Sequence, residues 1–137
     1  MKNTLLFYPT TLMFILTLFL YVKNYLNSVK AKKSDAIKFS YFKTYKGEVP
    51  DYLDVSRQTL KNQFELPIFF YFLTSVVIFF NQVDKIDLIC AWVFTITRYM
   101  HCYIRLTSNH VPYRAKVFKL GMLILIVWWF LFLYKVL

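Results

Sequence analysis

Glycine, proline and acidic residues are scarce in this chain of 137 residues. The 2 Gly and 4 Pro are too few for a loop-rich or collagen-like fold. Because the glycines stand only at positions 47 and 121, neither the dinucleotide motif GxGxxG nor the phosphate-binding loop GxxxxGK(S/T) can occur. Asp and Glu number 7 against 17 Lys and Arg, which leaves a formal net charge of +10. Nucleotide-binding classes are therefore disfavoured, and the excess of positive charge needs an explanation.

Cysteine and histidine are too few and too scattered for a metal site or a disulfide framework. The 2 Cys stand at positions 90 and 102 without a CxxC motif, and the 2 His stand apart at 101 and 110. Zinc sites and disulfide-rich domains need clustered ligands or several paired cysteines. We therefore expect no metal, and we interpret both cysteines as buried structural thiols.

Hydrophobic residues, by contrast, make up 58% of the chain and aromatic residues 21%, well above a soluble protein. Four long apolar segments are predicted as membrane-spanning helices over about residues 5–26, 58–80, 86–106 and 117–134. The uncharged residues 3–22 would span roughly 30 Å as a helix, which is one hydrocarbon thickness. The apolar runs are continuous and not alternating, so a β-barrel is disfavoured. We expect an all-α membrane protein, a four-transmembrane-helix bundle forming a single domain over residues 1–137.

A lysine-rich connector is predicted over residues 27–57. Its lysines alternate with aromatic residues, as at Phe39, Tyr41 and Lys43. Such mixtures occur in sites that bind single-stranded nucleic acid and in segments that lie on anionic lipid headgroups. Beside membrane spans the second interpretation is favoured, so we expect the lipid bilayer and no nucleic acid as the partner of this segment.

The distribution of positive charge predicts the orientation of the spans. Of the 17 Lys and Arg, all but Lys2, Lys85 and Lys135 fall within residues 23–61 and 98–119. Positive loops stay in the cytoplasm, so the first and third connectors should be cytoplasmic and both termini should lie on the other side. Attraction of an anionic substrate is a second explanation of the same charge, and the two can coexist.

Ionisable side chains fall within the third apolar segment. Arg98, His101 and Arg105 follow the spacing i, i+3, i+7, which places them on one face of a helix. An arginine at the centre of a membrane helix costs roughly 2.5–3.5 kcal/mol, so such residues usually serve a function. We therefore treat this face as the candidate functional region.

A second polar group precedes a proline in the second apolar segment. Asn62 and Glu65 stand three residues apart, just before Pro67. Proline lacks the amide N–H that a helix needs, so a kink is predicted there. If the second and third helices are neighbours, Glu65 can form an ion pair with Arg98 and neutralise a buried charge.

These motifs resemble those of the MAPEG family, the membrane-associated proteins in eicosanoid and glutathione metabolism. The run from Asn62 to Pro67, NQFELP, is similar to the second-helix signature of the family. The pattern RxxH, from Arg98 to His101, is similar to its third helix, and a PxR motif ending at Arg114 follows. The order, the spacing and the long first connector are nearest to the bacterial-type branch, which implies a multi-pass protein of a bacterial inner membrane.

The resemblance implies a homotrimer that binds glutathione between subunits near the cytoplasmic face. It implies glutathione transferase activity on a lipophilic electrophile or peroxidase activity on a hydroperoxide. By position, Arg114 is the catalytic residue, since an arginine beside the glutathione thiol favours the reactive thiolate. The implied glutathione-binding residues are Asn62, Glu65, Arg98, His101, Arg105 and Arg57. The alternative is a non-catalytic membrane scaffold or lipid-binding relative of the same fold.

Three positions depart from the family pattern. The residue after Arg114 is Ala115 and not a hydroxyl residue. Where active members often have an arginine in the second helix, this chain has Gln58, and the nearby Arg57 and Lys61 can replace it. Where a tyrosine often contacts glutathione in the third helix, this chain has Arg105.

Overall fold

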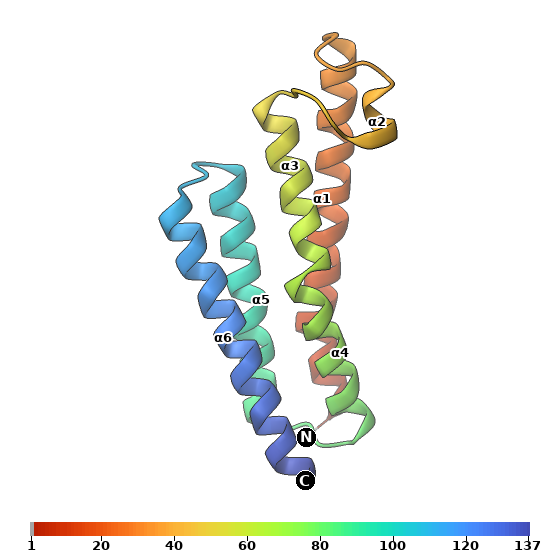
Figure 1. The fold of residues 1–137 in the computed structure, drawn as a ribbon. Coiled ribbons are helices and arrows are strands. Elements are labelled where there is room, and N and C mark those ends of the chain that lie inside the picture. Colours follow the sequence, from red (N-terminus) through yellow and green to blue (C-terminus); the bar gives the residue numbers. More distant parts are fainter. Residues whose placement is uncertain (1) are drawn as a thin grey trace.

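The computed structural model describes residues 2–137, and all regular structure in that range is helical. The elements in chain order are η1 (Asn3–Leu6), α1 (Phe7–Lys33), α2 (Tyr41–Thr44), α3 (Asp51–Lys61), η2 (Asn62–Phe64), α4 (Leu66–Phe79), α5 (Lys85–Leu106) and α6 (Val111–Val136). The helices α1 and α3–α4 run antiparallel, as do α5 and α6 (Figure 1). Both termini lie at one end of the bundle, and the first connector lies at the other (Figure 1).

The first two helices extend further at the connector end than the apolar pattern predicted. α1 continues to Lys33 and α3 begins at Asp51, so much of the expected connector is helical. The two helices rise above the ends of α5 and α6 (Figure 1). Apolar contacts hold them together there, because Ala31 and Leu53 are fully buried in a small cluster with Ile37. Hydropathy alone did not show this polar helical extension.

The second helix is broken where the proline predicted a kink. α3 passes into the 3-10 turn η2, and Glu65 adopts φ −102° and ψ −96°, outside the helical region. α4 then begins with Pro67 in its first turn, where the missing N–H removes no helical bond. The break divides this helix into the arm α3, which reaches the connector, and the apolar α4.

The main core lies between α4, α5 and α6. Phe70 stacks on Phe94 with 4.8 Å between ring centroids, and Trp128 packs against Phe70 at 6.0 Å. All three side chains are fully buried. α6 approaches α5 closely at Gly121, where an added Cβ would lie 2.7 Å from Thr97 Oγ1. The glycine therefore sets the distance between these two helices.

A polar clasp joins α5 to α6 at the terminal end of the bundle. The Asp87 carboxylate accepts a hydrogen bond from Trp128 Nε1 at 2.7 Å and one from Lys135 Nζ at 3.0 Å. Lys135 also forms an ion pair with Asp84 at 2.7 Å. Asp84 caps α5 in a reciprocal capping box with Asp87. Partial burial opposes ionisation of Asp84, but hydrogen bonds from Lys135 and from the Asp87 backbone outweigh it and lower its pKa.

Within residues 2–137, three helical stretches are long and apolar enough to cross a membrane. They are residues Asn3–Lys33, Asp51–Phe79 and Val111–Val136. α5, which the sequence predicted as a further span, does not reach that apolarity, because Asp87 and the arginines lie within it. It nevertheless runs beside the other helices over much of their length (Figure 1).

Candidate functional site

The polar face predicted on α5 points into the protein. Arg98 is fully buried, His101 is 3% exposed and Arg105 is 8% exposed. Their helical spacing places them in line, from the middle of α5 toward its end at Leu106. The structure therefore brings the three residues together inside the bundle, at the end where the lysine-rich connector lies.

Arg98 has no hydrogen-bond partner among residues 2–137. None of its three guanidinium nitrogens, Nε, Nη1 and Nη2, is hydrogen-bonded, although all three are buried. The guanidinium lies over the ring of Phe118, with Cζ 5.4 Å from the centroid. A cation–π contact offsets part of the cost of burying this charge, but an unpaired buried charge remains expensive. The guanidinium of Arg98 therefore keeps all its hydrogen-bond donors unused among residues 2–137.

The predicted ion pair between Glu65 and Arg98 is not formed. The ion pairs of the described chain are confined to Lys135 with Asp84 and Asp87. The break at the end of η2 explains the difference, because the turn at Glu65 leaves its side chain exposed on the surface of the protomer. The prediction treated the helix as continuous up to the proline, and that was wrong.

Arg105 instead connects α5 to the broken second helix. Its Nη2 donates to Gln58 Oε1 at 2.5 Å, and Gln58 Nε2 donates to Asp54 Oδ2 at 2.7 Å. With the Asn62 amide oriented to satisfy both neighbours, its oxygen accepts from Arg105 Nη1 at 3.1 Å and its nitrogen donates to Glu65 Oε2 at 3.2 Å. One hydrogen-bonded chain therefore runs from Asp54 to Glu65, with Arg105 at its centre.

Gln58 and Asp54 were not predicted as members of this site. The signal was present in the sequence, since residues 54, 58 and 62 follow one another at i, i+4 and share a helix face. Two of the departures from the family pattern, Gln58 and Arg105, are thus in direct contact. The guanidinium of Arg105, on α5, therefore lies at Gln58, the position where active family members often have an arginine.

Arg114 and His101 complete the group. Arg114 lies in the first turn of α6, and its Nη1 donates to Asn109 Oδ1 at 2.5 Å in the preceding turn. The charges of Arg98, Arg105 and Arg114 all act on His101. The His101 ring lies 5.7 Å from that of Phe118, and its buried Nδ1 has no partner in the described part of the chain.

Arg57 is the one predicted site residue that the structure places elsewhere. Its guanidinium lies over the rings of Tyr41 and Tyr45, with Cζ 5.4 Å and 4.4 Å from their centroids. It also donates a hydrogen bond to the Tyr41 hydroxyl. In this protomer Arg57 holds the connector against α3 and does not point into the group around Arg105.

The assembled site carries more positive than negative charge. The charges of three arginines act on one histidine, and the carboxylates of the group, Asp54 and Glu65, lie at its edge. No group of three or more His, Cys, Asp or Glu able to hold a metal ion occurs between residues 2 and 137. Arginine forks match carboxylates in shape and charge, so the arrangement can hold a small anion that carries a carboxylate.

Comparison with known proteins gives one match. The model of the MAPEG family matches residues 6–134, which is nearly the whole chain. No curated protein and no solved structure matches the chain.

Proposed function

The chain belongs to the MAPEG family, and from that premise we propose that it binds glutathione at the arginine group and directs its thiol to react with lipophilic substrates. The substrate is either an electrophile, in a transferase reaction, or a hydroperoxide, in a peroxidase reaction. Glutathione is the cosubstrate, and no metal or nucleotide takes part.

The unpaired guanidinium of Arg98 is the observation that carries this proposal. Glutathione has two carboxylates, and a carboxylate at Arg98 would satisfy nitrogens that are buried without a partner. Arg105 offers a second guanidinium, already oriented by Gln58 and Asn62. Burying the charge of Arg98 costs free energy in the protein without ligand, and a bound anion would offset this cost.

Arg114 is proposed as the catalytic residue. Its position in the first turn of α6 lets its charge act on a thiol bound beside His101. A nearby cation lowers the pKa of a thiol and so raises the fraction of reactive thiolate. In the transferase reaction the thiolate sulfur forms a bond to the electrophilic carbon and the leaving group departs with its electron pair. In the peroxidase reaction two glutathiones are oxidised to the disulfide while the hydroperoxide is reduced to an alcohol and water.

A homotrimer with four spans per subunit fits the same proposal. Glu65 is exposed on the single protomer at a level where the flanking helix is apolar, and an exposed carboxylate in lipid is expensive. A neighbouring subunit would cover Glu65 and enclose the arginine group. α5 then serves as the fourth span, because its charged face is turned inward and away from lipid.

The test is a glutathione titration of the detergent-purified protein. Wild type should bind glutathione at millimolar concentration with an ultraviolet thiolate signal, and should conjugate it to a chloronitrobenzene. Arg114→Ala should lose the thiolate signal and most of the conjugation. Lys116→Ala, which removes a charge from an exposed position two residues away, should keep both.

Absence of binding by wild type would remove the glutathione proposal. The chain would then be a non-catalytic scaffold or lipid-binding member of the family. If the wild type binds glutathione without a thiolate signal, only the proposed role of Arg114 is rejected.

A further inference from the structure

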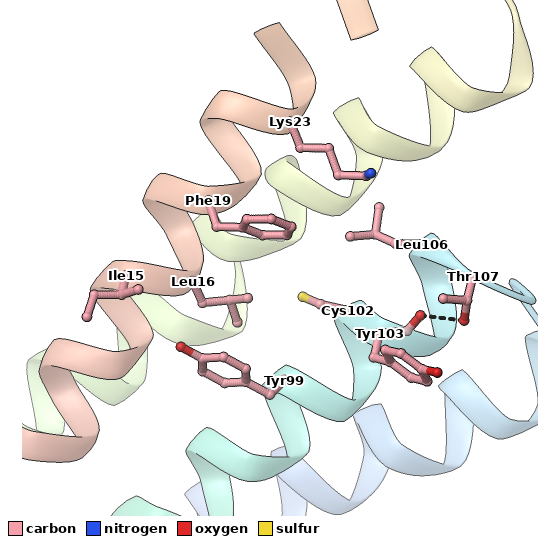
Figure 2. Close-up of a pocket in the computed structure, with 9 residues that line it drawn as sticks. All are labelled: Ile15, Leu16, Phe19, Lys23, Tyr99, Cys102, Tyr103, Leu106 and Thr107. Atoms are coloured by element: carbon pink, nitrogen blue, oxygen red, sulfur yellow. Dashed lines mark hydrogen bonds between the residues drawn. The ribbon is translucent and has the colours of Figure 1, made fainter. Parts of the chain in front are cut away.

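A groove of about 520 Å³ lies between α1 and α5, outside the arginine group. Figure 2 shows Leu16 and Phe19 of α1 opposite Tyr99 and Cys102 of α5, with Ile15 and Tyr103 at the edges of the groove. At ~100° per residue, the groove residues of α5 are centred roughly 120° around the helix from Arg98, His101 and Arg105. The groove is therefore a feature separate from the proposed glutathione site.

The groove has a buried floor and exposed walls. Leu16 and Cys102 are 5% and 2% exposed, whereas Phe19 and Tyr103 on the walls are 54% and 70% exposed. Tyr99 ties the two helices together, because its hydroxyl donates to the Leu12 carbonyl at 2.8 Å. No side chain of the described protomer covers the walls, although they are apolar and aromatic.

The length of the groove matches one leaflet of a bilayer. Ile15 and Lys23 mark its two ends on α1, and the helix rises ~12 Å between them. Half of a ~30 Å hydrocarbon core is about 15 Å. Lys23 is the first charged residue after the apolar run of α1, so it marks the level of the headgroups.

Lys23 gives the mouth of the groove its charge. The side chain reaches from α1 toward Leu106 and Thr107 at the end of α5 (Figure 2). It forms no ion pair or hydrogen bond with any described residue. A lysine at headgroup level above an apolar groove is the arrangement that suits an anionic lipid.

We propose that this groove binds one acyl chain of an anionic phospholipid, with the lipid phosphate on Lys23. The occupant comes from the leaflet that faces the lysine-rich connector. A second copy of this chain is disfavoured as the occupant, because Lys23 calls for an anion and the chain has only 7 acidic residues against 17 basic ones. The lipid occupies a site separate from that of glutathione and its second substrate.

The test is native mass spectrometry of the detergent-purified protein. It is titrated with phosphatidylglycerol and with phosphatidylcholine of the same acyl chains. Wild type should retain phosphatidylglycerol about five-fold more strongly, the ratio expected for one lysine at a lipid surface. Lys23→Gln should abolish this preference. Lys33→Gln, which removes the same charge from an exposed position further along α1, should preserve it.

A second variant tests the groove itself. Ile15→Trp places a bulky ring where the side chain is already 49% exposed, so it narrows the groove without disturbing the core. It should reduce retention of phosphatidylglycerol while leaving oligomer size and glutathione affinity unchanged. Equal retention by Lys23→Gln and Lys33→Gln, or by Ile15→Trp and wild type, would overturn the proposal. Loss of the oligomer in Ile15→Trp would also overturn it, because a second copy would then occupy the groove.

Discussion

Burying the Arg98 side chain is unfavourable for folding, whereas its unpaired guanidinium is suited to binding an anion. Its guanidinium is fully buried without a hydrogen-bond partner among residues 2–137, and it lies over the ring of Phe118. Replacing even a buried ion pair by apolar side chains of similar volume is often neutral or stabilising, and Arg98 lacks the paired partner that would offset its desolvation. The residue is thus expected to be retained for what it binds.

The variant Arg98→Met should separate the effect of Arg98 on stability from its effect on glutathione binding. Without glutathione, the variant should be as stable as wild type or more stable, by up to about 1–4 kcal/mol. With glutathione, the rise in melting temperature seen for wild type should be absent. Thermal unfolding in detergent, with and without glutathione, measures both effects. A variant that unfolds more easily and still binds glutathione would contradict the role assigned to Arg98.

Arg105 and Gln58 provide a second prediction, based on their contact at 2.5 Å. Arg105→Gln should weaken glutathione binding roughly 10- to 150-fold, since a charge-assisted hydrogen bond contributes roughly 1.5–3 kcal/mol. Exchanging the two residues, in Arg105→Gln with Gln58→Arg, returns a guanidinium to the same place from the opposite helix. Affinity should then recover in a titration. Additive losses in the double variant would show that the two side chains act separately.

At the scale of elements, α5 and α6 are held close by Gly121. An added Cβ would lie 2.7 Å from Thr97 Oγ1, a distance that real Cβ contacts do not reach. Gly121→Ala should therefore destabilise the protein by about 1–3 kcal/mol, as overpacking does.

Thr97→Ala provides the matched rescue of Gly121→Ala. It removes Oγ1, and the next nearest atom, the Thr97 Cβ, lies 3.6 Å away in ordinary contact. The double variant should unfold near the wild-type temperature, whereas Met122→Ala, at an exposed neighbouring position, should change little. If the double variant is no more stable than Gly121→Ala, the close approach of residue 121 to Thr97 is not the cause of the destabilisation.

The clasp between these helices predicts a dependence on pH. The pKa of Asp84 is lowered in the folded protein, despite partial burial, by hydrogen bonds from Lys135 and from the Asp87 backbone. A lowered folded pKa contributes stability that is present above the unfolded value of ~3.9 and is lost as the pH falls through the folded value. The melting temperature of wild type should therefore fall in acid.

Asp84→Asn is the control for this effect. Asparagine caps a helix as well as aspartate does, so the start of α5 should be kept while the titrating group is removed. Between neutral pH and pH ~4, the variant should melt somewhat below wild type, and the two should converge in stronger acid. An unchanged difference across this range would exclude Asp84 as a source of the dependence.

For the whole molecule, the arrangement in Figure 1 gives a test of orientation. The first connector and the turn between α5 and α6 lie at one end, and both termini lie at the other. By the positive-inside rule we expect the connector end to be cytoplasmic. A cysteine at Ser34, which is exposed, should react with an impermeant maleimide only after the cells are opened. A cysteine in place of Leu137 should react in intact cells once any outer membrane has been made permeable. The reverse labelling pattern would show that the protein has the opposite orientation.

Short-range patterns in the sequence predicted the helical class, the shared face of the polar residues on α5 and a kink near Pro67. Each follows from the chain alone, because apolar runs, a 3.6-residue period and a missing N–H act within a few residues. The same reasoning did not predict the apolar contacts within the connector. Ala31 and Leu53 are buried in one cluster although polar residues surround them in the sequence. Hydropathy averaged over a window of residues does not detect such contacts.

Local patterns along the chain therefore show which residues are polar within an apolar bundle and on which helix face they lie. The partners of these residues depend on how the helices pack. The turn at Glu65 leaves its carboxylate on the surface, Arg98 remains unpaired, and Arg105 reaches Gln58 across two helices. A contact between helices depends on how they approach and rotate, and that is settled by packing at residues such as Gly121, far along the chain from the groups that it positions.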